Sequence, residues 1–313
     1  MNRGTGRKSR GTLIAAGIVL VVLAAVALLG GAGAEGQVVE QATRSFVLAP
    51  GQTLSVVGRN GPITYEVWNG EAVRIEATAE APGLARALWR LMGGGDVVRF
   101  SQDATGVEAR ADARTSLLGW ANFKVRFHVR VPREWAGEVR LTNANAHITA
   151  SGLAGDSVLR TSNGPIAVQG MVGTLQARTS NGDISLADVH GSVTAVTSNG
   201  AVTIAGGNLA GSGRVQTSNA PIELRAGLAP DASYDVTTTN GAVWARLPDP
   251  DVAVELTAMN GHISSAADMV VAARGRERVA GRERERLAGR IGAGTAQLRI
   301  RTSNGQIALE TDL

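Results

Sequence analysis

Hydrophobic and polar residues alternate in short runs, and the same run returns many times along the chain. Apolar side chains stand four residues before an asparagine and three residues after it in each copy, and five residues after it in all copies but one, with polar or mixed positions between them. Around Asn181 these positions hold Ala177, Ile184 and Leu186. Alternation with a period of two is typical of a strand with one buried face. We therefore expect each copy to contain two strands joined at the asparagine.

The asparagines that anchor these copies return at a nearly constant spacing. They are Asn145, Asn163, Asn181, Asn199, Asn219, Asn240, Asn260 and Asn304. The successive separations are 18, 18, 18, 20, 21, 20 and 44 residues. A fixed period near 20 is typical of repeat arrays in which each unit packs only on its neighbours. The sequence thus predicts an all-β fold, a β-solenoid or β-helix-like stack.

Glycine follows the asparagine in most copies, which predicts a tight turn. A sharp turn with positive φ is open to glycine and is tolerated best, among the other residues, by asparagine. The residues assigned to this structural turn motif are Asn163, Gly164, Asn181, Gly182, Asn199, Gly200, Asn240, Gly241, Asn260, Gly261, Asn304 and Gly305.

Two arrangements of the strands fit this turn. In the first, the two strands of a copy pair with each other as a hairpin. In the second, each strand pairs with its counterpart in the next copy, and the turn is an arc. Like residues at equivalent positions favour the second arrangement. Stacked asparagine side chains would then form a hydrogen-bonded ladder along one edge.

The N-terminal residues predict export. Residues 1–10 form a basic tail, and residues 11–34 carry no charge and are long enough to cross a bilayer as a helix. We expect a single transmembrane span with the C-terminal domain outside the cytoplasm. The alternative is a signal peptide cleaved between Ala34 and Glu35, which would give a secreted protein.

Between this segment and the repeats, residues 35–135 are expected to form an N-terminal β region. A short amphipathic helix is predicted over 82–92, either capping the stack or contacting a membrane or partner. Residues 123–131 predict a strand with one basic, solvated face. The repeat domain is expected over 136–313. It is interrupted at 266–294 by an insertion rich in arginine and glutamate, which predicts an exposed loop or loose helix, or a docking arm for an anionic polymer.

Charge and composition exclude several classes of function. The four basic residues before position 35 account for the net charge of +4, and the remainder is balanced, so the high pI does not indicate nucleic-acid binding. The chain has no cysteine. His147 and His262 share a repeat position on distant copies, and a whole repeat separates Asp183 from Glu223. We therefore predict no catalytic, cofactor-binding or metal-binding residues, and no enzyme activity.

The repeated Thr-Ser-Asn-Gly-x-Ile run, as at 179–184, resembles the bacterial putative-adhesin family of β-strand-repeat domains of unknown function. The resemblance covers about residues 45–311 and includes the Phe127–Pro132 strand. It implies a membrane-linked, extracytoplasmic β-solenoid-like domain without established catalytic residues. Together with the basic flank, the apolar segment and the repeats, this leads us to expect a domain that binds or scaffolds at the cell envelope, with an envelope polymer or a protein as its partner. The alternatives are a carbohydrate-active β-helix enzyme and an accessory in envelope-stress signalling.

Overall fold

The computed structural model describes residues 37–91, 96–111, 123–248, 250–279 and 281–312. The basic tail and the apolar segment predicted over 1–34 lie outside these residues. In the part of the chain that is described, no helix is both long enough and apolar enough to span a membrane. The helix predicted over 82–92 is present as α2 (Gly83–Leu91), which contacts β1 (Gln37–Phe46) and β4 (Val73–Ala81).

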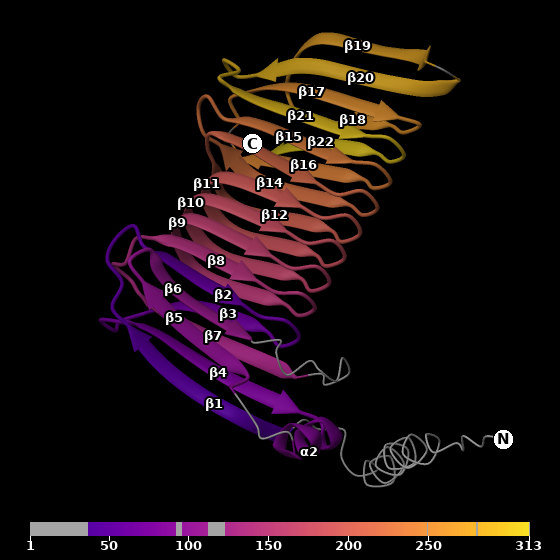
Figure 1. Ribbon diagram of the computed structural model, residues 1–313. Helices are drawn as coiled ribbons and strands as arrows, with labels where there is room; N and C mark the ends of the chain where they lie inside the picture. The colour runs from indigo at the N-terminus through magenta and orange to yellow at the C-terminus, as the bar shows by residue number, and fades with distance from the viewer. Residues whose placement is uncertain (1–36, 92–95, 112–122, 249, 280, 313) are drawn as a thin grey trace, which may run out of the picture.

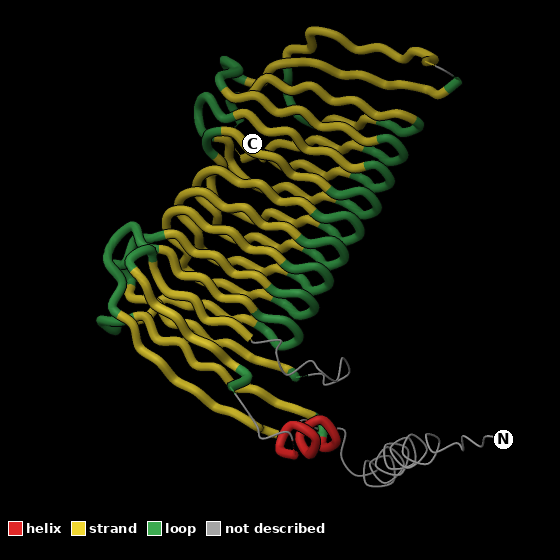
Figure 2. The backbone as a smooth tube through the Cα atoms, in the orientation of Figure 1, coloured by secondary structure: helices red, strands yellow, loops and turns green. Residues whose placement is uncertain are grey.

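The protein is an elongated stack of coils built from one continuous 22-stranded sheet (Figure 1). Each coil has an entry side, whose strands lead into the asparagine turn, and an exit side, whose strands leave it. The turns line one long edge of the molecule (Figure 2). In stacking order, the entry side comprises β5 (Val98–Asp103), β6 (Gly106–Ala111), β2 (Thr53–Val57), β8 (Glu138–Thr142), the ends of β9 (Ile148–Arg160), β10 (Ile166–Arg178) and β11 (Ile184–Val196), then β13 (Ser212–Gln216), β15 (Ser233–Thr238), β21 (Ala296–Thr302), β17 (Val252–Met259), β20 (Arg282–Ile291) and β19 (Val270–Val279). The exit side comprises β1, β4, β7 (Lys124–Pro132), β3 (Ile63–Trp68), the starts of β9, β10 and β11, then β12 (Val202–Leu209), β14 (Ile222–Leu228), β16 (Val243–Pro248), β22 (Ile307–Asp312) and β18 (Ile263–Ser265).

Strands of successive repeats pair with one another in parallel, which confirms the stacked arrangement over the hairpin. Ile166 of β10 lies beside Ile184 of β11, and Arg178 lies beside Val196, with the register one repeat apart throughout. A parallel ladder of this kind cannot be closed by a two-residue hairpin turn. The turn is therefore an arc within one coil.

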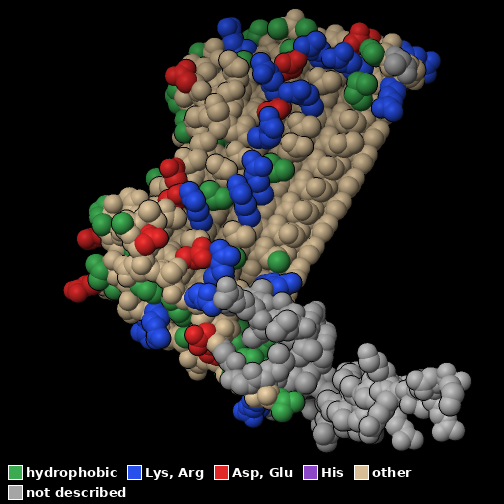
Figure 3. Space-filling view, in the orientation of Figure 1, with side chains coloured by type: hydrophobic (Ala, Val, Ile, Leu, Met, Phe, Trp, Pro, Cys, Tyr) green, Lys and Arg blue, Asp and Glu red, His purple; other side chains and the backbone are tan. Residues whose placement is uncertain are grey.

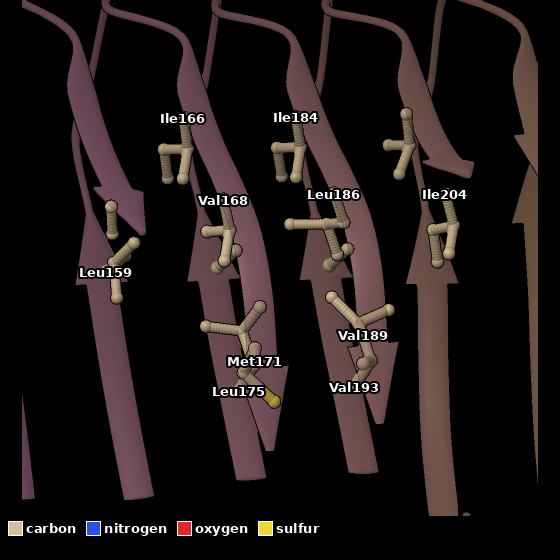
Figure 4. Packing of buried hydrophobic residues seen from close by; sticks show 14 of the residues in the cluster. Leu159, Ile166, Val168, Met171, Leu175, Ile184, Leu186, Val189, Val193 and Ile204 are labelled. Atoms are coloured by element: carbon tan, nitrogen blue, oxygen red, sulfur yellow. The ribbon is translucent and has the colours of Figure 1, made fainter. Parts of the chain in front are cut away.

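The core is a narrow column of aliphatic side chains that repeats from coil to coil. Figure 4 shows Ile166 and Ile184 at one level of adjacent coils and Val168 and Leu186 at the next level. All four are buried. Each such side chain contributes about 1.5–3 kcal/mol when it is fully removed from water. The same cluster continues into the N-terminal strands, where Ile63 and Phe127 are fully buried.

The predicted asparagine ladder is present along the turn edge. The side-chain amide of Asn181 donates to Asn163, and that of Asn199 donates to Asn181, each at 2.7 Å. Corresponding bonds of 2.7–3.2 Å join the rest of the series, which runs Asn60, Asn145, Asn163, Asn181, Asn199, Asn219, Asn240, Asn304 and Asn260. Asn60, which precedes the predicted repeat domain, is the first member of this ladder.

The reason given for the turn glycines requires correction. None of the six glycines in the predicted motif has a positive φ, and among the anchor asparagines only Asn260 does. Glycine is needed for close approach instead, because a Cβ built on Gly182 would lie 2.0 Å from the carbonyl oxygen of Gly164 in the coil below. Positive φ occurs on the opposite edge, at return-turn residues such as Gly170 and Asp188.

A buried row of threonines closes each turn from within. The Thr197 hydroxyl donates to the carbonyl of Gly182 in the previous coil at 3.0 Å and accepts the amide of Gly200 in its own coil at 3.3 Å. Thr179 makes the same two contacts one coil earlier. Because both hydroxyls are buried, these bonds satisfy backbone groups that water does not reach.

Both ends of the stack depart from chain order. At the C-terminal end, β21 and β22 lie between the coil of β15–β16 and the coil of β17–β18, which precedes them in sequence. At the N-terminal end, β2 and β3 lie between β8–β9 and β6–β7.

An antiparallel pair of strands finishes each end. β1 and β4 follow β7, and β19 and β20 follow β17. The prediction of a loop or loose helix over 266–294 is therefore wrong. Leu287 and Ile291 on β20 are buried because that strand pairs with β17, whereas β19 on its far side is exposed.

Candidate binding surface

The entry side of the stack carries rows of arginine on its outward face. Along each strand, residues five and three positions before the anchor asparagine point outward, since the residues between them are buried. Arg160 on β9 and Arg178 on β10 occupy the second of these positions and are direct neighbours in the ladder. Arg214 on β13 occupies the first. β11 lies between β10 and β13, so Arg214 is two strands from Arg178, at about 4.8 Å for each strand.

Among the residues described, these three guanidinium groups form no ion pair with an acidic side chain, whereas the nearest arginines towards either end of the stack do. Towards the C-terminal end, Arg301 is bound to Asp235 at 2.9 Å, and Arg299 and Arg286 both reach Glu255. Towards the N-terminal end, Arg140 is bound to Glu138 at 2.7 Å. Arg160, Arg178 and Arg214, which we call the arginine cluster, therefore form no ion pair within the described part of the chain, and Asp235, the cross-strand neighbour of Arg214, pairs with Arg301 instead.

The arginine cluster is exposed to solvent on a face without loops. Arg160, Arg178 and Arg214 are all exposed. Arg160 and Arg178 are the last residues of β9 and β10, next to the asparagine turns, and Arg214 lies within β13. Figure 3 shows Lys and Arg side chains gathered along the middle of the visible face, beside the uncharged turn edge. Guanidinium groups bind phosphate and carboxylate through paired hydrogen bonds. The surface can thus bind an extended anion that runs along the stack.

The basic strand predicted over 123–131 is present as β7, and three of its four basic side chains have acidic partners. His128 lies 2.8 Å from Glu66, and Arg126 lies 3.1 Å from Glu80. Arg130 lies 3.2 Å from Glu76. The basic face of β7 is therefore matched by acidic residues of β3 and β4 on either side.

The structure does not bring the other chemically distinctive residues together. Asp183 accepts the Ala201 amide at 2.8 Å, and the coil containing Thr203 lies between the strands that carry Asp183 and Glu223. His147 and His262 sit at opposite ends of the turn edge. Within the described ranges, no group of three metal-ligating side chains is found.

Arg160, Arg178 and Arg301 recur at one polar position of the repeat, but no site is predicted there from the sequence. The signal was available, because all three stand three residues before an anchor asparagine. What the sequence does not show is which arginines have a carboxylate within reach, since that depends on the order of the coils.

A family model described as Toastrack DUF4097 matches residues 119–310. The chain belongs to this family. The match begins near β7 and ends within β22, so it covers nearly all of the repeat array.

Solved structures add similarity at low sequence identity. A putative adhesin from Bacteroides fragilis is 10% identical, with 87% of this chain and 97% of that chain covered and a TM-score of 0.42. A putative adhesin from Parabacteroides distasonis is 12% identical, with coverage of 86% and 97% and a TM-score of 0.39. No curated protein matches the chain.

Proposed function

We propose that this Toastrack protein is a non-catalytic, extracytoplasmic binding domain, held at the cell membrane by residues 11–34, that binds an anionic polymer of the cell envelope through the arginine cluster. The observation that carries the proposal is the set of three exposed arginines without acidic partners on a regular face. A polymer with a repeating phosphate or carboxylate can contact several coils of a stack at once, and each added contact strengthens the whole.

The membrane part of the proposal is supported by the sequence. Four basic residues precede the uncharged segment 11–34, which is the arrangement that keeps the N-terminus in the cytoplasm. Fractionation of cells expressing the full chain tests it. We expect the protein in the membrane fraction. A variant that lacks residues 11–34 and is exported by a cleavable signal peptide should be released from the membrane. A mature N-terminus at Glu35 would support the secreted form instead, and recovery of the full chain from the cytoplasm would refute both.

Binding is tested with the full chain in detergent and three polymer probes. Polyphosphate and poly-glutamate distinguish phosphate from carboxylate, and dextran is the neutral control. We expect saturable binding of at least one anionic probe, weakened as salt is raised from low to physiological levels because exposed charges are then screened. The triple variant Arg160→Gln, Arg178→Gln, Arg214→Gln should bind at least tenfold more weakly.

A matched triple variant separates the arginine cluster from net charge. Arg59, Arg278 and Arg282 are exposed on the turn edge and the C-terminal hairpin, and their replacement by glutamine removes the same charge. This control should bind like the parent. Equal losses in the two triple variants would show that only net charge matters and would refute the arginine cluster as the site.

A further inference from the structure

A pocket that is chemically different from the arginine cluster lies at the N-terminal end of the stack, on the edge opposite the asparagine turns. It has a volume of about 550 Å³ and is formed where the loops at 47–52, 69–72 and 133–137 meet. These loops lie together at that edge in Figure 2. Leu48 and Val73 form its buried floor, and Trp68 and Trp135 form its walls. Pockets of this size and lining are typical of small-molecule sites.

Backbone contacts hold both indole rings in place. The Trp68 indole N–H donates to the carbonyl of Ala72, and the Trp135 indole N–H donates to the carbonyl of Ala49, each at 3.2 Å. Each tryptophan also packs over the glycine two residues later. A Cβ built on Gly70 would lie 2.2 Å from Trp68, and one built on Gly137 would lie 2.2 Å from Trp135. The rings are thus fixed while remaining only half-buried.

The three loops are tied to one another, so the pocket is already formed in the free protein. The Arg133 amide donates to the carbonyl of Trp68 at 3.3 Å, which joins the second loop to the third. The Gly51 amide donates to the carbonyl of Ala136 at 2.8 Å, which joins the first to the third. A preformed site binds its ligand without the entropy loss of ordering loops.

Polar side chains surround this aromatic pocket without internal partners. Asn69, Glu71, Arg133 and Glu134 are exposed and line the pocket, and in the part of the chain that is described no side chain pairs with theirs. They offer carboxylate acceptors, guanidinium donors and an amide that does both. Fixed aromatic faces inside a ring of free hydrogen-bonding groups match a ligand with apolar faces and polar edges.

We propose that this pocket binds a sugar ring of a glycan. A pyranose presents C–H groups on its faces, which pack on an indole, and hydroxyls at its edge, which bond to carboxylate, amide and guanidinium groups. The proposal does not depend on the arginine cluster, which lies on the face of a different part of the stack. A protein with both sites binds a glycan and an anionic polymer independently.

Titration calorimetry of the full chain tests the proposal. A polyoxyethylene detergent is used because alkyl glycosides would compete for the pocket. The probes are the tetrasaccharides of β-linked N-acetylglucosamine, β-linked glucose and α-linked glucose. We expect saturable binding of at least one tetrasaccharide. Its affinity should be at least tenfold lower for Trp135→Ala, and it should also be lower for the double variant Glu71→Gln, Glu134→Gln. The Arg160, Arg178, Arg214 triple variant should bind the sugar like the parent.

Trp244→Ala is the matched control, because Trp244 is 43% exposed on β16, far along the stack from the pocket. It should leave sugar binding unchanged. If Trp135→Ala lowers the melting temperature, the double glutamine variant decides the result, since both glutamates are exposed and without partners. Absence of saturable binding to all three tetrasaccharides, or binding of choline chloride in their place, would overturn the assignment to a glycan.

Discussion

The side-chain amide of Asn304 donates to Asn240 at 2.8 Å, although the two residues are 64 positions apart in sequence. Asn260, which lies between them in the chain, bonds instead to the far side of Asn304 at 3.2 Å. The last coil of the chain is therefore inserted between two coils that are made before it. The strands at the C-terminal end of the stack can therefore take their final order only after the chain has been synthesised beyond residue 296.

Truncation after Thr295 should therefore open the C-terminal end of the stack. The deletion removes four fully buried leucine and isoleucine side chains, Leu298, Ile300, Ile307 and Leu309, each worth about 1.5–3 kcal/mol of burial. It also leaves β15 and β17 without their shared partner. We expect residues 252–291 to become protease-sensitive while the middle repeats resist, because each repeat contacts only its neighbours.

Limited proteolysis followed by mass spectrometry measures this effect. Truncation after Asp312, which removes only the last residue, is the control and should give the parent pattern. If truncation after Thr295 also gave the parent pattern, the inserted coil would not be what secures the strands around it.

Thr197→Val tests the buried hydroxyl row. Valine has nearly the same shape, but it leaves the Gly182 carbonyl and the Gly200 amide without their partner. An unsatisfied buried polar group costs about 1–3 kcal/mol, so the free energy of unfolding should fall by about 2 kcal/mol or more. Thr203→Val on the outward face of β12 should change it little. Urea unfolding followed by circular dichroism compares the two variants, and equal effects would contradict a special role for Thr197.

The repeating part of this fold could be predicted because each copy carries its own local signal. The residues at fixed distances from Asn163, Asn181 and Asn199 alternate in the same way, so strand, turn and ladder follow from one pattern. The positive φ expected at Gly182 was wrong for a physical reason. The sequence shows that a glycine is present at position 182. The reason for it, the short distance to the Gly164 carbonyl, exists only once the coils are stacked.

The ends of the stack could not be predicted in the same way. A separation of 44 residues between Asn260 and Asn304 shows that an insertion exists, but not that its far side returns to pair with the coil of Asn240. Residues 274–278 of β19 alternate arginine with glycine and glutamate, and the whole strand is exposed, so the segment lacks the alternation of apolar and polar residues that predicts a strand. The tryptophan pocket is built from three loops distant in sequence, which no local pattern brings together.

Gly182→Ala should be strongly destabilising, since the added methyl group would meet the backbone of Gly164 rather than a movable side chain. Overpacking of this kind costs about 1–3 kcal/mol. Gly275→Ala in β19 is the matched control, because a Cβ there meets nothing within 4 Å and φ is not positive. Thermal melts compare the two. Ala220 occupies the equivalent position of another turn, so the stack accepts a methyl group there. If Gly182→Ala had the melting temperature of the parent, adjacent coils would be able to move apart at Gly182 at little cost as well.

The last prediction concerns Glu285, a buried carboxylate that fastens the C-terminal hairpin to the final turn. It accepts the Ile263 amide at 3.0 Å and lies 3.2 Å from both Arg276 and His262. Burial raises the pKa of Glu285. The hydrogen bonds from Ile263 and Arg276 and the charges of Arg276 and His262 outweigh burial, so the pKa lies below its usual value.

A lowered pKa in the folded state means that the carboxylate stabilises the fold above the unfolded pKa of about 4.3. That contribution is lost as the pH falls through the lower folded value. Glu285→Gln should therefore unfold more easily than the parent at pH 7, and the difference should shrink towards pH 3. Asp103 and Asp251, whose pKa values are also lowered, are present in both proteins, so their effects cancel in the comparison. Urea unfolding at the two pH values measures the difference. Glu277→Gln, an exposed change on the same hairpin, is the control, and its effect on the free energy of unfolding should depend little on pH. If Glu285→Gln lowered the free energy of unfolding by the same amount at both pH values, the charge of Glu285 would not be what holds the hairpin.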